Sequence, residues 1–151
     1  MKATYRVLAY LVPVLVALQA SFIALGVFGL GSWVSDGHDL TKNVLENGGS
    51  TGDLGFMLHS IGAMVMIVIA LMLLIVSFLA KIEGGVRAAA LVFIDVVLQW
   101  VLALISFSAW AVGLLHGLNA FLLFGPGMMA AGAATRSMKG ETSSAPVAST
   151  V

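Results

Sequence analysis

The uncharged apolar run from Val7 to Val34 constrains the fold most, because a soluble core rarely contains a segment of this length and hydrophobicity. About 20 apolar residues suffice for a helix to cross the hydrocarbon core of a bilayer. With 60% hydrophobic and 9% charged residues, the 151-residue chain has more apolar surface than a soluble domain of its size can bury. We therefore predict an all-α integral membrane protein in a lipid bilayer, an up-down four-helix bundle with spans at about 7–33, 55–80, 87–108 and 112–135.

The beginning of the chain could also be read as a signal peptide with a small-residue cleavage site near Ala20. A signal sequence has an apolar region of about 7–15 residues, and this run is nearly twice as long. The length favours a membrane span, in which Pro13 is tolerated near the start of the helix.

The basic residues predict the orientation of the helices. One side of the four-helix topology carries Lys2, Arg6, Lys81, Arg87, Arg136 and Lys139, whereas Lys42 alone lies on the other side. Basic residues concentrate in cytoplasmic segments, so we expect both termini in the cytoplasm of a cell with this protein in its inner (plasma) membrane. The acidic loop 35–53, with one helical turn around 40–46, is then external, and residues 136–151 form a flexible cytoplasmic tail.

The composition also excludes several kinds of site. The chain has no cysteine, which excludes disulfides, iron–sulfur clusters and thiolate metal sites. Its formal net charge of +0 gives no reason to expect nucleic acid as a partner. It carries no nucleophile paired with a general base, so no catalytic residue is predicted.

Two histidines lie at the same predicted depth in the second and fourth spans. His59 precedes Lys81 by 22 residues and His116 precedes Arg136 by 20 residues. At about 1.5 Å per residue, both lie roughly 30 Å from the cytoplasmic flank. Spans two and four are diagonal neighbours in an up-down bundle, and paired imidazoles from facing helices hold haem iron in such bundles. The spacing is therefore compatible with haem b that has His59 and His116 as its axial, metal-binding ligands.

Small residues at this level would leave room for the flat haem ring. They are Gly26 in span one, Gly62 in span two, Ser106 in span three and Gly117 in span four. The alternative is that small residues simply let membrane helices approach each other, while the histidines hydrogen-bond at the interface. Met57 beside His59 also leaves open an outer copper site.

Three further polar residues lie inside the spans. Gln19 and Gln99 have about the same depth, so we expect a structural amide pair joining spans one and three. Asp95 is the only acid within a span. It is either a proton-relay group or a protonated acid bonded to Gln99 one turn away.

Short motifs give a resemblance to known families. They are Leu18-Gln19, Leu58-His59-Ser60-Ile61-Gly62, Leu98-Gln99 and Leu115-His116-Gly117-Leu118-Asn119-Ala120. In this order they resemble one four-helix half of haem A synthase, and also a group of small bacterial four-helix membrane proteins of unknown function. The resemblance covers roughly residues 10–135 and implies haem binding at His59 and His116. Haem A synthase is a doubled bundle with a catalytic glutamate that this chain lacks, so the synthase reaction is not implied.

Three functions remain open on the sequence alone. The first is a haem-binding membrane protein for electron transfer or haem handling at the outer face. A single outer haem cannot pass electrons across the membrane. Only Lys42 and, at low pH, His38 are available outside for its propionates, so this function implies a redox or complex partner. The second is a cofactor-free accessory or assembly subunit, and the third a transporter using Asp95. The sequence is also compatible with a homo-oligomer.

Overall fold

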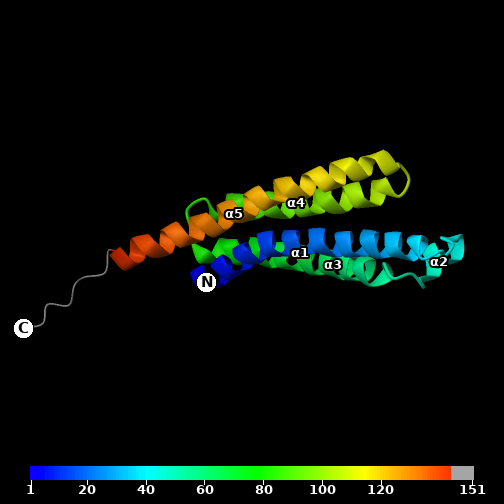
Figure 1. Cartoon of the computed structure of the whole chain (residues 1–151). Coiled ribbons are helices and arrows are strands. Elements are labelled where there is room, and N and C mark those ends of the chain that lie inside the picture. Colours follow the sequence, from blue (N-terminus) through cyan, green and yellow to red (C-terminus); the bar gives the residue numbers. More distant parts are fainter. Residues whose placement is uncertain (144–151) are drawn as a thin grey trace, which may run out of the picture. The chain divides into compact units, whose positions relative to one another are not determined.

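The computed structural model describes residues 1–143 and is entirely helical over that range (Figure 1). The helices, in chain order, are α1 (Lys2–Ser35), α2 (Lys42–Asn47), α3 (Asp53–Ala80), α4 (Gly85–Ser106), the 3-10 turn η1 (Trp110–Val112) and α5 (Gly113–Ser143). Four of them, α1, α3, α4 and α5, are long and apolar enough to cross a membrane. The prediction of a multi-pass, all-α chain with four spans is confirmed, and this architecture is consistent with a four-helix bundle.

The chain divides into two compact units. One comprises residues 14–66, with most of α1, all of α2 and the first half of α3; we call it the α1–α3 unit. The other comprises residues 1–13 together with the chain from 67 onward; we call it the α4–α5 unit. Each unit is described separately below.

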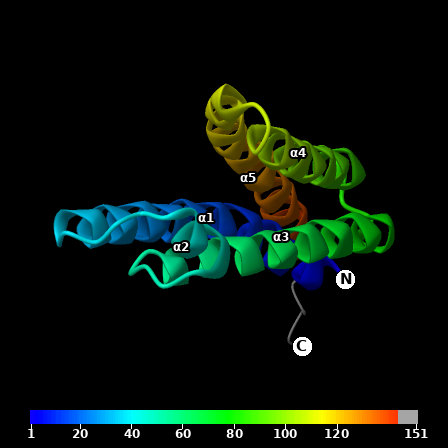
Figure 2. The same cartoon turned by 90° about the vertical axis from the view of Figure 1, so that its right-hand side faces the viewer.

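Glycines hold α1 and α3 close together in the α1–α3 unit, where the two helices run antiparallel (Figure 2). A Cβ atom on Gly29 would lie 2.7 Å from the Thr51 carbonyl oxygen, and one on Gly55 would overlap the backbone of Gly26. Thr51 also donates its hydroxyl hydrogen to the Gly29 carbonyl, at 2.6 Å. Such close backbone approach is typical of membrane helix pairs with small residues at the contact.

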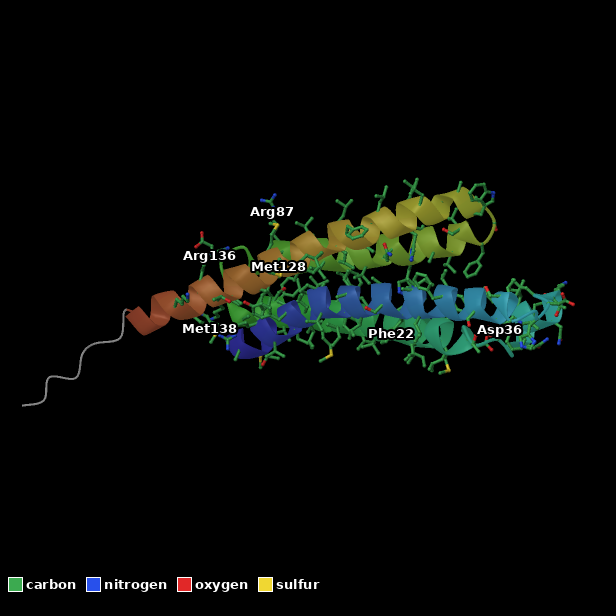
Figure 3. The ribbon with its side chains drawn as sticks, viewed as in Figure 1. Phe22, Asp36, Arg87, Met128, Arg136 and Met138 are labelled. Atoms are coloured by element: carbon green, nitrogen blue, oxygen red, sulfur yellow. The ribbon has the colours of Figure 1, made fainter. Side chains whose placement is uncertain are left out.

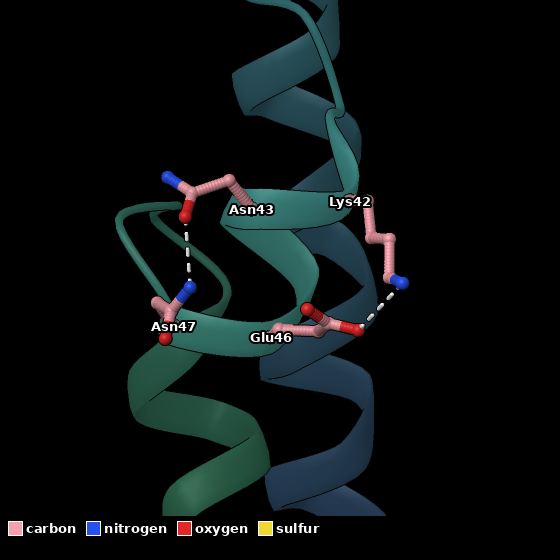
Figure 4. A network of polar contacts seen from close by, with 4 residues as sticks. All are labelled: Lys42, Asn43, Glu46 and Asn47. Carbon is pink, nitrogen blue, oxygen red and sulfur yellow. Dashed lines mark hydrogen bonds and ion pairs between the residues drawn. The ribbon is translucent and has the colours of Figure 1, made fainter.

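The polar loop between α1 and α3 contains the short helix α2, which confirms the predicted helical turn. Thr41 caps it by accepting a hydrogen bond from the Val44 amide, at 3.2 Å. Figure 4 shows two contacts between exposed residues on its two flanks, the Lys42–Glu46 ion pair at 3.4 Å and the Asn47–Asn43 hydrogen bond at 2.8 Å. Asp53, the first residue of α3, accepts hydrogen bonds from the Gly49 amide and from Ser50. These local bonds determine where the polar loop ends and α3 begins.

In the α4–α5 unit, α4 packs antiparallel to α5 and the start of α1 joins them. The Tyr5 hydroxyl donates to the Gly85 carbonyl at 2.8 Å, and the Lys2 ammonium donates to the Ser137 hydroxyl at 3.1 Å. Arg87 and Arg136 lie toward the same end of this unit (Figure 3). The buried side chains of the unit include Tyr5, Ala9, Val12, Leu73, Val92, Val96, Ala130, Ala131 and Ala134.

The helix ends differ from the predicted spans in two places. Helix α1 begins at Lys2 rather than near residue 7, because its first turns are anchored by Tyr5 and Lys2. Helix α5 continues to Ser143, eight residues beyond the predicted end at 135. The expectation of a flexible tail from residue 136 is therefore wrong for 136–143, where no proline interrupts the helix and Ser137 contacts Lys2. The remaining tail residues, 144–151, lie outside the described range.

Candidate functional site

His59 is bonded to Gln19 by two reciprocal hydrogen bonds within the α1–α3 unit. The Nδ1 atom of His59 lies 3.1 Å from the backbone oxygen of Gln19. In return, the Gln19 side chain donates its Nε2–H to the backbone oxygen of His59, at 3.0 Å. Each side chain thus bonds to the backbone of the other residue, which fixes the register between α1 and α3 at this level.

His116 has the same relationship with Gln99 in the α4–α5 unit. Its Nδ1 atom lies 3.0 Å from the Gln99 backbone oxygen, and Gln99 Nε2 donates to the His116 backbone oxygen at 2.9 Å. The glutamine lies on the first helix of the pair and the histidine on the second, as in the α1–α3 unit. The chain therefore contains the same glutamine–histidine clamp twice, a repeat that the sequence analysis missed.

The clamps determine which nitrogen of each ring carries the proton. A backbone carbonyl oxygen can only accept a hydrogen bond, so the Nδ1 atom that faces it must be the donor in His59 and in His116. In the neutral ring this leaves the lone pair on Nε2. An imidazole whose Nδ1–H is held by a carbonyl and whose Nε2 has the lone pair is the usual arrangement of a metal-binding histidine.

The two clamps differ at the residue three positions after the histidine. After His116 this residue is Asn119, which is 4% exposed and donates to the Gln99 Oε1 atom at 2.8 Å. After His59 it is Gly62, and a Cβ atom there would lie 2.8 Å from Gln19 Oε1. Glycine has no side-chain donor, and Gln19 Oε1 is buried without a hydrogen-bond partner among the described residues.

The small residues differ in what surrounds them. The space above Gly26 is filled by the Phe56 ring, 2.8 Å from a Cβ built there, and the space above Gly62 is filled by Gln19. These two glycines therefore let α1 and α3 approach each other, and a place for either of them beside a cofactor stays a prediction. Gly117 has nothing within 4 Å of such a Cβ atom. The Ser106 hydroxyl bonds to the Leu102 carbonyl of its own helix, at 2.6 Å.

Asp95 lies one turn from Gln99 on α4, but both ends of the Gln99 amide are bonded to residues of α5. The Asp95 backbone oxygen accepts the second hydrogen bond of Asn119, at 3.2 Å. The α4–α5 unit therefore joins Asp95, Gln99, His116 and Asn119 into one polar network. The sequence analysis singled out Asp95, Gln99 and His116 from this network, and it did not predict a role for Asn119.

His38, the third histidine, is part of the loop and stacks on Trp33 with ring centroids 4.0 Å apart. No group of three or more histidine, aspartate and glutamate side chains gathers in residues 1–143 as a metal site would require. A haem iron needs only two protein ligands. His59 and His116 belong to different units, as do Gln19 and Gln99, so the facing of the two imidazoles and the amide pair both stay predictions.

Searches of protein-family models, curated proteins and solved structures give no match to this chain, so the clamps themselves are the basis for a functional assignment.

Proposed function

We propose that the protein is a small multi-pass membrane protein that binds haem b through His59 and His116, for electron transfer or haem handling. Its position would be the plasma membrane, with both termini in the cytoplasm and the histidines toward the outer face. This orientation is supported by the α4–α5 unit, in which the Lys2–Ser137 contact brings the two basic ends of the described chain together, and Arg87 lies toward the same end.

One observation carries the proposal: both histidines have the same Nδ1–H···O=C bond, at 3.1 Å and 3.0 Å. A histidine that only has to satisfy its hydrogen bonds inside a membrane helix can do so in either tautomer. Two histidines on separate helix pairs with the same tautomer, set by the same kind of backbone acceptor, fit the requirements of axial ligands. The four apolar helices provide the low-dielectric surroundings in which b-type haem is commonly held.

The chemistry divides between the cofactor and the protein. When bound, haem iron supplies reversible one-electron transfer. His59 and His116 would hold the iron through Nε2, while Gln19 and Gln99 hold the rings by their backbone oxygens. The external loop offers Lys42 and His38 to the propionates, but Lys42 already pairs with Glu46 and His38 stacks on Trp33. We therefore include a membrane redox or complex partner in the proposal.

A specific contact favours a second candidate, the cofactor-free accessory or assembly subunit. Gln99 Nε2 lies 3.3 Å from His116 Nε2 as well as 2.9 Å from the His116 backbone oxygen. The clamp can thus satisfy the His116 ring entirely within the α4–α5 unit. In that case both clamps would serve to join helices, and iron would have to displace the Gln99 amide from Nε2.

An absorption spectrum of the full chain distinguishes the two candidates. The protein should be purified in mild detergent from cells supplied with a haem precursor, and apoprotein should be titrated with hemin. The proposal predicts a Soret band, sharp α and β bands on reduction, and a titration endpoint of about one haem per chain. Folded protein that is colourless and takes up no hemin would reject haem binding and favour the accessory subunit.

A further inference from the structure

We propose that Asn119 is a positioning residue that reinforces the Nδ1–H tautomer of the His116 ring by orienting the Gln99 amide. Its consequence for iron binding rests on the proposed function, but the assignment itself concerns the protein without haem. It follows from a chain of four hydrogen bonds in the α4–α5 unit.

This series of hydrogen bonds begins at the backbone oxygen of Asp95, which fixes the direction of the first bond. The Asp95 carbonyl can only accept, so the Asn119 side-chain atom 3.2 Å from it must be the donor Nδ2. The same Nδ2 atom lies 2.8 Å from the Gln99 side chain, and the atom it meets there must be the acceptor Oε1. The other end of the Gln99 amide is consequently Nε2, which donates to the His116 backbone oxygen at 2.9 Å.

The last contact in this series is with the Nε2 atom of the imidazole. Gln99 Nε2 carries two hydrogens, and its second contact is His116 Nε2 at 3.3 Å. An N–H group facing Nε2 favours the tautomer with the lone pair on Nε2, the same tautomer that the Gln99 backbone oxygen selects at Nδ1. Without Asn119, the amide orientation depends on the bond from Gln99 Nε2 to the His116 backbone oxygen alone, so the turned amide, which presents Oε1 to the ring and favours a proton on Nε2, becomes less unfavourable.

The α1–α3 unit supplies a natural comparison. Gly62 occupies the position equivalent to Asn119, and the Gln19 Oε1 atom has no donor among the described residues. The Gln19 amide bonds to the His59 backbone oxygen through Nε2, whereas the Gln99 amide is bonded at both its Nε2 and its Oε1 ends. Asn119 accordingly makes the clamp at His116 more rigid than the clamp at His59, so the two proposed ligands are not equivalent.

The test is a nitrogen NMR spectrum of ring-labelled histidines in the full-length, haem-free protein, with Asn119→Leu compared with wild type. Leucine has the same number and branching of side-chain heavy atoms as asparagine, although it is larger, and it has no donor. The fraction of neutral His116 with its proton on Nε2 should rise about fivefold, which corresponds to about 1 kcal/mol for one lost hydrogen bond. His59 in the same sample should not change. Ser106→Ala, which removes an intrahelical hydroxyl bond on α4, is the matched control and should leave both rings unchanged.

The outcomes separate this inference from haem binding. An unchanged His116 tautomer in folded Asn119→Leu protein, or an equal change in Ser106→Ala, would overturn the role of Asn119, whatever the absorption spectrum shows. If Asn119→Leu does not fold, wild-type protein provides the second measurement. The side-chain amide hydrogens of Gln99 should exchange with deuterium more slowly than those of Gln19, and equal or faster exchange at Gln99 would contradict the proposal.

Discussion

Gln19 and His59 bond to each other's backbones across α1 and α3, with Nε2 to oxygen at 3.0 Å and Nδ1 to oxygen at 3.1 Å. Gln99 and His116 repeat the relationship across α4 and α5. A polar side chain inside a membrane is tolerated when its hydrogen bonds are satisfied, and here each residue of a pair satisfies the other. The clamp also leaves the imidazole in the tautomer that binds metals through Nε2.

The difference between the clamps predicts different costs for removing the two glutamines. Gln99→Leu loses the bonds to His116 and Asn119, so it should lower the free energy of unfolding in detergent by about 1–2 kcal/mol. Gln19→Leu loses one bond but also removes the buried, unpaired Oε1 atom, so its cost should stay within about 0.5 kcal/mol. An equal or greater loss for Gln19→Leu would show that Oε1 has a partner in the folded protein.

The glycine contact predicts that one added methyl group separates α1 from α3. Gly55→Ala would place its Cβ atom against the Gly26 backbone, which cannot move aside as a flexible side chain could, and should cost about 1–3 kcal/mol. Gly31→Ala on α1 is the matched control, because nothing lies within 4 Å of its Cβ position. That variant should be neutral or more stable by up to about 1 kcal/mol, since alanine favours a helix. Similar stabilities of the two variants in thermal unfolding followed by circular dichroism would contradict the contact.

The distribution of basic residues predicts the topology. Reporter fusions at the amino terminus and after Ser143 should both report the cytoplasm, and a reporter in the loop at Asn47 should report the outside. Moving positive charge should weaken this preference: replacing Arg136 and Lys139 by Gln while adding two lysines near Asn43 should produce a mixed orientation. An external amino or carboxyl terminus in the wild type would overturn the orientation and the outer position of both histidines.

The four spans could be predicted because hydropathy depends only on local sequence. Their ends were less accurate, because Lys2 and Ser137 bond to each other over 135 residues, and no local pattern reports that contact. Both histidines and both glutamines were identified as the polar residues that matter. Their partners were not, because Gln19 and Gln99 were matched to each other by depth, and depth does not show which helices pack together.

A signal for the clamps was nevertheless present in the sequence. Each helix pair has one glutamine in its first helix and one histidine near the start of its second. This shared order of glutamine and histidine is hard to recognise in the sequence because the spacing differs between the two pairs. The polar loop with α2 separates α1 from α3, whereas a short turn joins α4 and α5. The side of a helix on which a glycine lies also cannot be read from depth alone, which is why the sequence left both a cofactor and a helix contact open for Gly26 and Gly62.

The measurement that tests the central claim most directly is the low-spin haem spectrum of His59→Ala, His116→Ala and His38→Ala proteins beside the wild type. If His59 and His116 are the axial ligands, each of their single variants should lose haem or show a high-spin spectrum, because half of the axial field is gone. His38→Ala, which removes only the ring stacked on Trp33, should keep the wild-type spectrum and about one haem per chain. An unchanged low-spin spectrum in both His59→Ala and His116→Ala would contradict the assignment of the ligands.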